Sequence, residues 1–164
     1  MKNFPHQELT KSIIGIYYNV YNELGFGFLE KVYHKSLLIE LKRNGYNIIG
    51  YDITPMQSDI KDYRSVKPDK IFALDVFEHI PKEQIEKIIV NFKLMNPNFK
   101  LIITIPTENL ISRKVRKLLG KEERVKGHIT NIKEILYILN RELILIKRFN
   151  FLTVTKIFVF KNKN

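Results

Sequence analysis

Hydrophobic residues recur at helical spacing along the first 44 residues. Over 7–24 they form a single stripe, made up of Leu9, Ile13, Ile16, Tyr17, Val20, Tyr21 and Leu24. Gly25 and Gly27 interrupt the pattern, and a second amphipathic stretch follows over 28–43. Asn44 and Gly45 end that stretch with residue types that tolerate the left-handed backbone of a helix C-terminus. The pattern therefore predicts a two-helix N-terminal segment, residues 1–44.

From residue 45 onward, short apolar runs alternate with amphipathic stretches. The apolar runs predict strands over 46–53, 70–76, 99–106, 142–149 and 151–160, and the amphipathic stretches predict helices over 81–95, 107–119 and 131–140. Strands that alternate with helices are typical of an α/β domain with a mostly parallel sheet. The last two strands are separated by little more than Asn150, which favours an antiparallel pair at the end of the sheet. We expect one α/β domain over 45–164.

The amino-acid composition excludes several kinds of functional site. The chain contains no cysteine, which excludes a disulfide scaffold, a thiolate zinc site and a cysteine nucleophile. No apolar run approaches the roughly 20 residues that span a bilayer, and the start MKNFPHQELT has no apolar signal core. We therefore expect a cytoplasmic protein without a membrane segment.

The chain is basic, with 28 Lys and Arg against 17 Asp and Glu, a formal net charge of +11. The densest basic cluster comprises Arg113, Lys114, Arg116, Lys117, Lys121, Arg124 and Lys126. Such a cluster is either a solvated face or a patch for phosphate or an anionic substrate. No nucleic-acid-binding motif accompanies it, so we expect no nucleic-acid partner.

Acidic residues follow the predicted strands. Asp52 ends the strand over 46–53, Asp59 and Ile60 come shortly after it, and Asp75 ends the strand over 70–76. In open parallel sheets, ligands bind beyond the carboxyl ends of the strands. A carboxylate there can accept both hydroxyls of a ribose, and another can accept an adenine amino group while an apolar neighbour covers the ring. Each acid alone also fits a loop or cap, but their order together predicts a nucleoside site.

Several segments, in order, resemble class I S-adenosylmethionine-dependent methyltransferases. They are NIIGYDITP, SDI, DKIFALDVFEHIP, LIITIPTEN, GHITNIKEIL and the final ELILIKRF and TVTKIFVF, within about residues 40–162. DVFEHIP is similar to the D-V-x-E-H-I segment after the fourth strand of that family, and the last two runs are similar to its reversed hairpin. The resemblance implies a Rossmann-like fold, S-adenosylmethionine as cofactor and a small-molecule methyl acceptor.

The same resemblance implies roles for individual residues. Asp52 and Ile53 would hold the cofactor ribose, Asp59 and Ile60 the adenine, and Asp75 the methionine end. Glu78 and His79 would lie close to the transfer site as catalytic residues, and each also fits a structural role in a capped loop. His128 would contact the substrate or serve as a structural histidine.

The most diagnostic part of the methyltransferase pattern, a first strand followed by a glycine-rich loop, is missing. Gly25 and Gly27 in NELGFGF offer the nearest match, but the segment before them favours helix over strand, although IIGIYYNV (13–20) could serve as that strand. We therefore expect the first strand to be absent. An incomplete sheet exposes an edge and apolar faces, so a homodimer through that region is a further hypothesis.

Residues 8–41 resemble a different family, named for its GxxExxY pattern, which Gly27, Glu30 and Tyr33 satisfy. That family resembles PD-(D/E)xK nucleases, in which the helix Glu helps to bind a divalent metal together with later carboxylates and a Lys. A strand Asp followed by Glu-x-Lys is not recognisable later in this chain, so Glu30 is interpreted as a surface or capping acid. The four histidines are scattered and show no metal-ligand spacing, so we expect no metal site.

Three functional hypotheses remain. The first is a methyltransferase-like enzyme for a small-molecule acceptor, weakened by the missing glycine-rich loop. The second is a non-catalytic fusion remnant. The third is a nuclease-like protein, which the resemblance of residues 8–41 indicates. A serine-hydrolase G-x-S-x-G elbow and a P-loop G-x-x-x-x-G-K-[ST] are both absent from the sequence.

Overall fold

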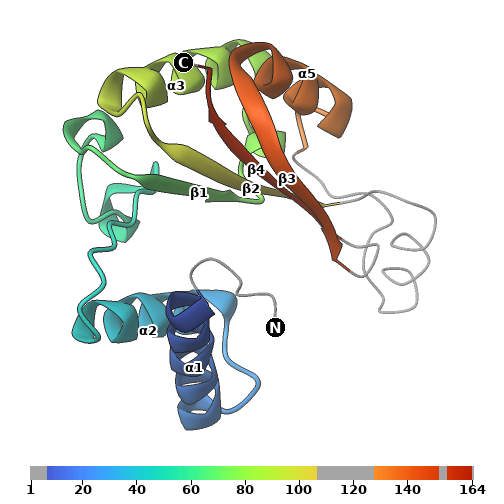
Figure 1. Ribbon diagram of the computed structural model, residues 1–164. Coiled ribbons are helices and arrows are strands. Elements are labelled where there is room, and N and C mark those ends of the chain that lie inside the picture. Colours follow the sequence, from blue (N-terminus) through green and yellow to red (C-terminus); the bar gives the residue numbers. More distant parts are fainter. Residues whose placement is uncertain (1–6, 107–127, 152–154, 164) are drawn as a thin grey trace. The chain divides into compact units, whose positions relative to one another are not determined.

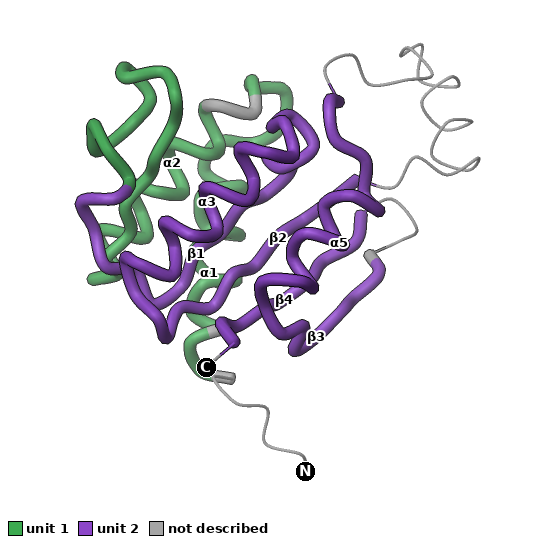
Figure 2. The backbone as a smooth tube through the Cα atoms, turned by 90° about the horizontal axis from the view of Figure 1, so that it is seen from above, with its two compact units in different colours: residues 1–63 green, residues 64–164 purple. Residues whose placement is uncertain are grey.

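The computed structural model of the chain describes residues 7–106, 128–151 and 155–163. The chain forms two compact units, Met1–Tyr63 (unit 1) and Arg64–Asn164 (unit 2), whereas the sequence predicts a division after residue 44 (Figure 2). The predicted helix over 107–119 and the basic cluster over 113–126 lie outside the described residues. Within the described ranges, no helix is both long enough and apolar enough to cross a membrane.

Unit 1 contains two helices, α1 (Gln7–Leu24) and α2 (Glu30–Arg43), as the sequence predicts (Figure 1). The described core of this unit is small, because Ile16, Val20 and Leu41 are its buried hydrophobic residues. Much of the predicted apolar stripe of α1 stays exposed, including Tyr17 at 50%. Unit 1 therefore buries little apolar surface for its length, which limits how firmly its helices are held.

The connection between α1 and α2 explains two members of the GxxExxY pattern. Gly25 and Gly27 adopt φ angles of 71° and 105°, which disfavour residues with a Cβ atom. The Tyr33 hydroxyl donates a 2.7 Å hydrogen bond to the Gly25 carbonyl, and its ring stacks on Tyr21. Gly27 and Tyr33 thus shape the turn between the helices, a structural role.

The segment 46–53, predicted as a buried strand, is not a strand in the structure. It is folded back on the chain that follows it: the Asp59 amide donates to the Gly50 carbonyl at 2.9 Å, and the Gly50 amide donates to Asp59 Oδ2 at 2.8 Å. The prediction was wrong because an apolar run becomes a strand only where a neighbouring strand can pair with it. Among the described residues of unit 1, no such strand exists.

The sheet of unit 2 consists of β1 (Lys70–Leu74), β2 (Lys100–Pro106), β3 (Leu143–Phe151) and β4 (Thr155–Asn162). Its strand order is β1-β2-β4-β3, in which β1 and β2 are parallel and β4 runs antiparallel to both β2 and β3 (Figure 1). The antiparallel final pair is confirmed. The described sheet is mixed, however, and not mostly parallel, because one of its three pairings is parallel.

Two helices, α3 (Lys82–Met95) and α5 (Ile132–Glu142), cover the same face of this sheet (Figures 1 and 2). Their apolar residues recur at helical spacing and meet alternate residues of the strands, which is the arrangement that buries one sheet face. The buried residues are Ile85, Ile89 and Phe92 on α3, Ile135, Ile138 and Leu139 on α5, and Ala73, Leu101, Ile103, Ile105, Phe158 and Phe160 on the strands.

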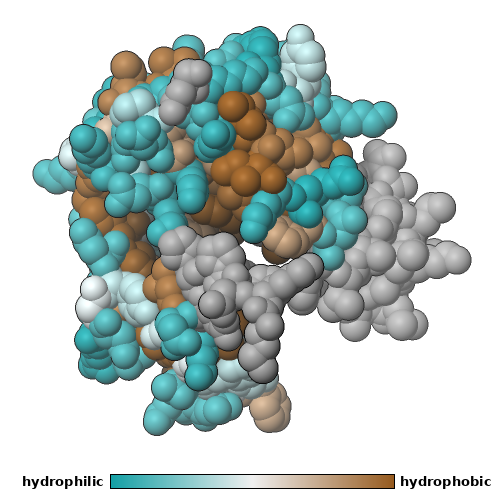
Figure 3. Space-filling view, in the orientation of Figure 1, coloured by the Kyte–Doolittle hydropathy of each residue, from teal (hydrophilic) through white to brown (hydrophobic). Residues whose placement is uncertain are grey.

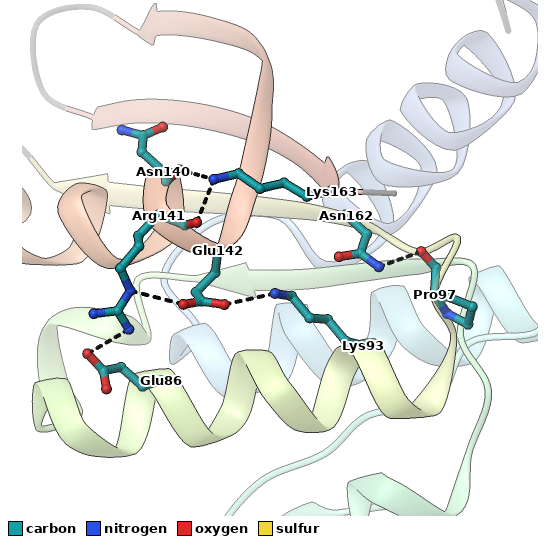
Figure 4. Close-up of polar contacts among 8 residues, drawn as sticks. All are labelled: Glu86, Lys93, Pro97, Asn140, Arg141, Glu142, Asn162 and Lys163. Carbon is teal, nitrogen blue, oxygen red and sulfur yellow. Dashed lines mark hydrogen bonds and ion pairs between the residues drawn. The ribbon is translucent and has the colours of Figure 1, made fainter.

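Polar contacts join the ends of α3, α5 and β4 at one edge of this core (Figure 4). Glu142 accepts from Lys93 Nζ at 2.8 Å and from Arg141 Nε at 2.9 Å, and Arg141 also pairs with Glu86 at 3.1 Å. Lys163 donates to the carbonyls of Asn140 and Arg141. These contacts fix the C-terminal end of α5 against α3 and the last residues of the chain.

The opposite face of the sheet carries exposed apolar side chains. Phe72 and Leu74 of β1 are 63% and 55% exposed, and Phe149 of β3 is 51% exposed. In Figure 3, hydrophobic residues are visible at the surface among hydrophilic ones. The described residues of unit 2 therefore form a two-layer α/β structure, in which α3 and α5 cover one face of the sheet.

Candidate functional site at the end of strand β1

The chain leaves β1 through a strained residue. Asp75 has a φ of 52°, the one positive φ among the described non-glycine residues. Its amide donates to Thr104 Oγ1 at 2.9 Å, and Thr104 Oγ1 donates to Asp75 Oδ1 at 2.7 Å. Thr104 of the neighbouring strand thus holds this left-handed conformation, which places an exposed carboxylate at the carboxyl end of β1.

A 3-10 turn, η3 (Phe77–His79), follows directly. Phe77 is 2% exposed and anchors the turn in the core, while the His79 amide donates to the Val76 carbonyl at 3.1 Å. Glu78 is only 3% exposed, and His79 lies at the surface. The turn therefore points a carboxylate inward and places an imidazole beside it.

A segment far along the chain is bound to this turn. The amides of Ile129 and Thr130 donate to the Glu78 carbonyl at 2.7 and 3.2 Å, and Thr130 Oγ1 donates to the Ile80 carbonyl at 2.6 Å. These bonds hold the preceding residue, His128, next to the turn.

The other end of that segment is fixed by the start of α5. Asn131 forms a capping box: its side chain accepts from the amides of Lys133 and Glu134, and Glu134 Oε2 accepts from the Asn131 amide at 3.1 Å. The residues from His128 to Asn131 are thus bonded both to η3 and to α5. These bonds give His128 a defined position at the start of its described segment.

Three side chains converge here: Glu78, His79 and His128 each offer one ligand atom, and these atoms all lie within 4.8 Å of one another. The two imidazole rings have centroids 5.1 Å apart at an interplanar angle of 73°. Neither carboxylate oxygen of Glu78 has a hydrogen-bond partner in another described residue. A buried carboxylate without partners is costly, and such a group in a native protein calls for a functional explanation.

Burial raises the pKa of the Glu78 carboxyl, and the negative charge of Asp75 acts in the same direction. The amide of Glu78 itself, His79 and His128 lower it. The cluster can therefore hold a proton at Glu78, or compensate the carboxylate with a positive charge. A buried carboxyl group with a raised pKa beside two imidazoles makes this turn a candidate functional site.

The remaining candidates of the sequence analysis lie in unit 1. Asp59 is exposed, and its Oδ2 accepts from Lys42 Nζ and from the Gly50 amide, both at 2.8 Å. The Lys42 hydrogen bond is the main reason that the pKa of Asp59 is lowered. Asp52 Oδ1 accepts from the Thr54 amide at 2.7 Å, Ile53 is 90% exposed, and Ile60 is half-buried.

The structure brings Asp75, Glu78, His79 and His128 together within unit 2. The expectation of no metal site rests on spacing along the chain, and such spacing does not reveal that His79 and His128 approach each other through tertiary contacts. Thr104 and Thr130, which position the cluster, were not predicted. No local pattern marks them, since each acts on a residue distant in sequence.

Comparison with protein families identifies a superfamily match. Residues 7–96, just over half of the chain, match the family model described as the PD-(D/E)XK nuclease superfamily. The match extends well beyond the segment 8–41, through Asp52, Asp59, Asp75 and Glu78. The nuclease part of the sequence-based resemblance is thereby confirmed, and the narrower GxxExxY assignment stays a prediction. None of the curated proteins matches the chain.

Comparison with solved structures shows the fold. The PH0226 protein from Pyrococcus horikoshii OT3 is similar over 78% of each chain, with a TM-score of 0.57 and 13% identity. Two others have TM-scores of 0.47. The pyocyanin biosynthetic protein PhzM has 10% identity over 60% of this chain and 31% of its own. Magnesium protoporphyrin IX methyltransferase (ChlM) from Synechocystis PCC 6803, with bound SAH, has 15% identity over 79% of this chain and 61% of its own.

Proposed function

We propose that the chain, which belongs to the PD-(D/E)XK nuclease superfamily through residues 7–96, acts as a methyltransferase-like protein and not as a nuclease. The proposal rests on the cluster in unit 2 and not on the family match. The proposed cofactor is S-adenosylmethionine, and the proposed substrate is a small-molecule methyl acceptor. The observation that carries the proposal is the buried Glu78 carboxylate at the carboxyl end of β1, which lies beside two histidines and has no hydrogen-bond partner in another described residue. That end of a strand is where open α/β sheets bind ligands.

The nuclease signature is incomplete in this chain. Its name specifies Pro-Asp followed by an acid, any residue and Lys, and Pro68-Asp69 provides the first part. After Asp69, no Asp or Glu of the chain is followed by Lys two positions later. At Asp75 that position is Phe77, which is buried in the core of unit 2. A nuclease centre of the superfamily type would therefore lack its lysine.

The methyltransferase resemblance runs through the cluster itself. The segment DVFEHIP provides Asp75, Glu78 and His79, and GHITNIKEIL provides His128. The strand order with its antiparallel final pair agrees with the reversed hairpin that this resemblance implies. The agreement of the site residues with the strand order supports the methyltransferase reading over a chance likeness of short segments.

Asp75 presents an exposed carboxylate anchored by Thr104, which suits the methionine end of the cofactor. The other candidates from the sequence, Asp52, Ile53, Asp59 and Ile60, lie in unit 1, so the cofactor proposal rests on the residues of unit 2 alone.

When bound, S-adenosylmethionine supplies an electrophilic methyl group on a sulfonium. The residues of the chain would then act on the acceptor. His79 is at the surface and would take the proton that the acceptor hydroxyl or amine loses, while His128 would orient the acceptor. Glu78, buried behind both rings, would stabilise the imidazolium that results.

Calorimetry on the full chain with S-adenosylmethionine and S-adenosylhomocysteine tests this proposal. We expect saturable binding of both, weakened about tenfold or more by Asp75→Ala, because a charge-assisted hydrogen bond is lost. Glu83→Ala, which removes an exposed acid from α3, is the matched control and should bind normally. Absence of binding to the wild-type chain, or unchanged binding by Asp75→Ala, would exclude the proposal.

A second candidate is a metal-dependent nuclease, which the family match favours. Incubation of the full chain with DNA and Mg²⁺ or Mn²⁺ tests it. Cleavage that is lost in Glu30→Gln would establish nuclease chemistry and remove the methyltransferase proposal as the main activity. No cleavage in either metal would agree with the incomplete signature.

A further inference from the structure

The cluster of Glu78, His79 and His128 has the composition of a metal site. We propose that these three side chains bind a divalent transition metal, with Zn²⁺ as the best-fitting ion. The inference goes beyond the proposed function, because it concerns the three side chains alone and can be tested in the absence of any methyl donor.

The first argument is geometric. One ligand atom from each residue lies within 4.8 Å of the other two, close enough for small adjustments to bring all three onto one ion. Zinc in catalytic-type sites is bound by three protein ligands, two histidines and one carboxylate being a common set, with the fourth position left to water or substrate. Since His79 lies at the surface, that fourth position would be accessible from outside.

The second argument is the state of Glu78. Its side chain is almost completely buried, and both carboxylate oxygens lack a partner in another described residue. A cation between the carboxylate and the two imidazoles would supply the missing compensation.

The third argument concerns rigidity. Glu78 and His79 lie on a turn anchored by the buried Phe77, and His128 precedes a segment bonded to Glu78 and Ile80. All three ligands are thus placed by backbone hydrogen bonds that do not depend on the metal. Preorganised ligands of this kind lose little conformational entropy on binding.

The choice of metal follows from the donors. Imidazole nitrogen suits Zn²⁺ and its transition-metal neighbours, whereas Mg²⁺ and Ca²⁺ require a set of oxygen ligands that this cluster does not provide. With a metal bound, His79 would act as a ligand in place of the general-base role proposed for the metal-free site. The metal would then lower the pKa of a bound acceptor hydroxyl or water.

Zinc titration of the metal-stripped full chain by calorimetry tests the proposal. We expect one Zn²⁺ per chain, with the affinity reduced about 100-fold in Glu78→Gln and in His79→Asn. His34→Asn, which removes a histidine of α2 in unit 1, is the matched control and should bind zinc like the wild type. Zinc binding that is absent from the wild type, or that survives unchanged in both cluster variants, would overturn the proposal.

A second measurement is independent of loss-of-function variants. The chain has no cysteine, so His128→Cys introduces its one thiol. With Co²⁺ as the probe, this variant should show a thiolate-to-cobalt charge-transfer band that the wild type lacks, because only position 128 can supply a thiolate. A folded His128→Cys variant that binds Co²⁺ without such a band would show that residue 128 is not a ligand.

Discussion

The carbonyl oxygen of Glu78 accepts a 2.7 Å hydrogen bond from the backbone amide of Ile129. This bond joins the turn after β1 to the segment before α5, and it brings His128 beside His79. The proposed site therefore depends on a main-chain contact that no side-chain motif encodes.

The hydroxyl of Thr130 strengthens that junction and offers a test that leaves the three proposed ligands intact. Thr130→Val removes its 2.6 Å hydrogen bond to the Ile80 carbonyl while it keeps the side-chain shape. We expect zinc affinity to fall about tenfold, as for other groups that orient metal ligands, and the free energy of unfolding to fall by about 1 kcal/mol. Calorimetry and urea denaturation measure the two effects. Unchanged zinc affinity would show that the junction does not position His128.

The buried carboxylate of Glu78 should destabilise the metal-free protein. Because burial raises its pKa, the folded chain holds the proton more tightly than the unfolded chain does. Stability is then highest below the unfolded pKa and is lost as the pH rises through the folded pKa. Glu78→Gln removes this loss, so the variant should be more stable than the wild type at neutral pH by about 1 kcal/mol. A less stable variant in thermal melts with a chelator present would contradict this reasoning.

Glu142 should show the opposite pH dependence. Its pKa is lowered, first by the hydrogen bond from Lys93 and then by that from Arg141. Its contribution is therefore present above the unfolded pKa and is lost as the pH falls through the folded pKa. Glu142→Gln should weaken unit 2 by about 1 kcal/mol at neutral pH and flatten the acid limb of its stability curve. Urea denaturation from neutral to acidic pH measures this, and an unchanged acid limb would show that the ion pairs in Figure 4 contribute nothing.

Two glycines of unit 1 should respond in opposite directions to the same substitution. Gly27 has a φ of 105°, so Gly27→Ala should lower stability by about 1 kcal/mol or more, although no atom lies within 4 Å of the added Cβ. Gly15 lies within α1 and also has open space around it, so Gly15→Ala should raise stability by about 0.5–1 kcal/mol. Circular dichroism melts compare the pair. Equal effects would mean that the backbone at Gly27 is not strained.

The elements with strong helical spacing could be predicted from the sequence, because their periodicity is set by their own residues. This holds for the helices α1, α3 and α5. The strand β2 could also be predicted, from its continuous apolar run. The segment 46–53 has a similar apolar texture but forms no strand, since pairing depends on a neighbour that a local pattern cannot reveal. The same limit applies to the site. Glu78 and His79 are adjacent and could be singled out together, whereas His128 joins them only through the folded backbone.

We predict a homodimer that forms by pairing of β1, the strand at one edge of the described sheet, with a second copy. Among the described strands, β1 lies at one end of the order β1-β2-β4-β3, and its Phe72 is 63% exposed. An edge strand with exposed apolar side chains is a template for pairing with a second copy. Sedimentation velocity at increasing concentration should show a dimer that Phe72→Lys dissociates, because a lysine on an edge strand opposes its pairing with a second copy. Leu94→Lys, which changes a 79% exposed residue of α3 in the same way, should leave the dimer intact. A wild-type chain that stays monomeric at the highest concentration would refute the homodimer.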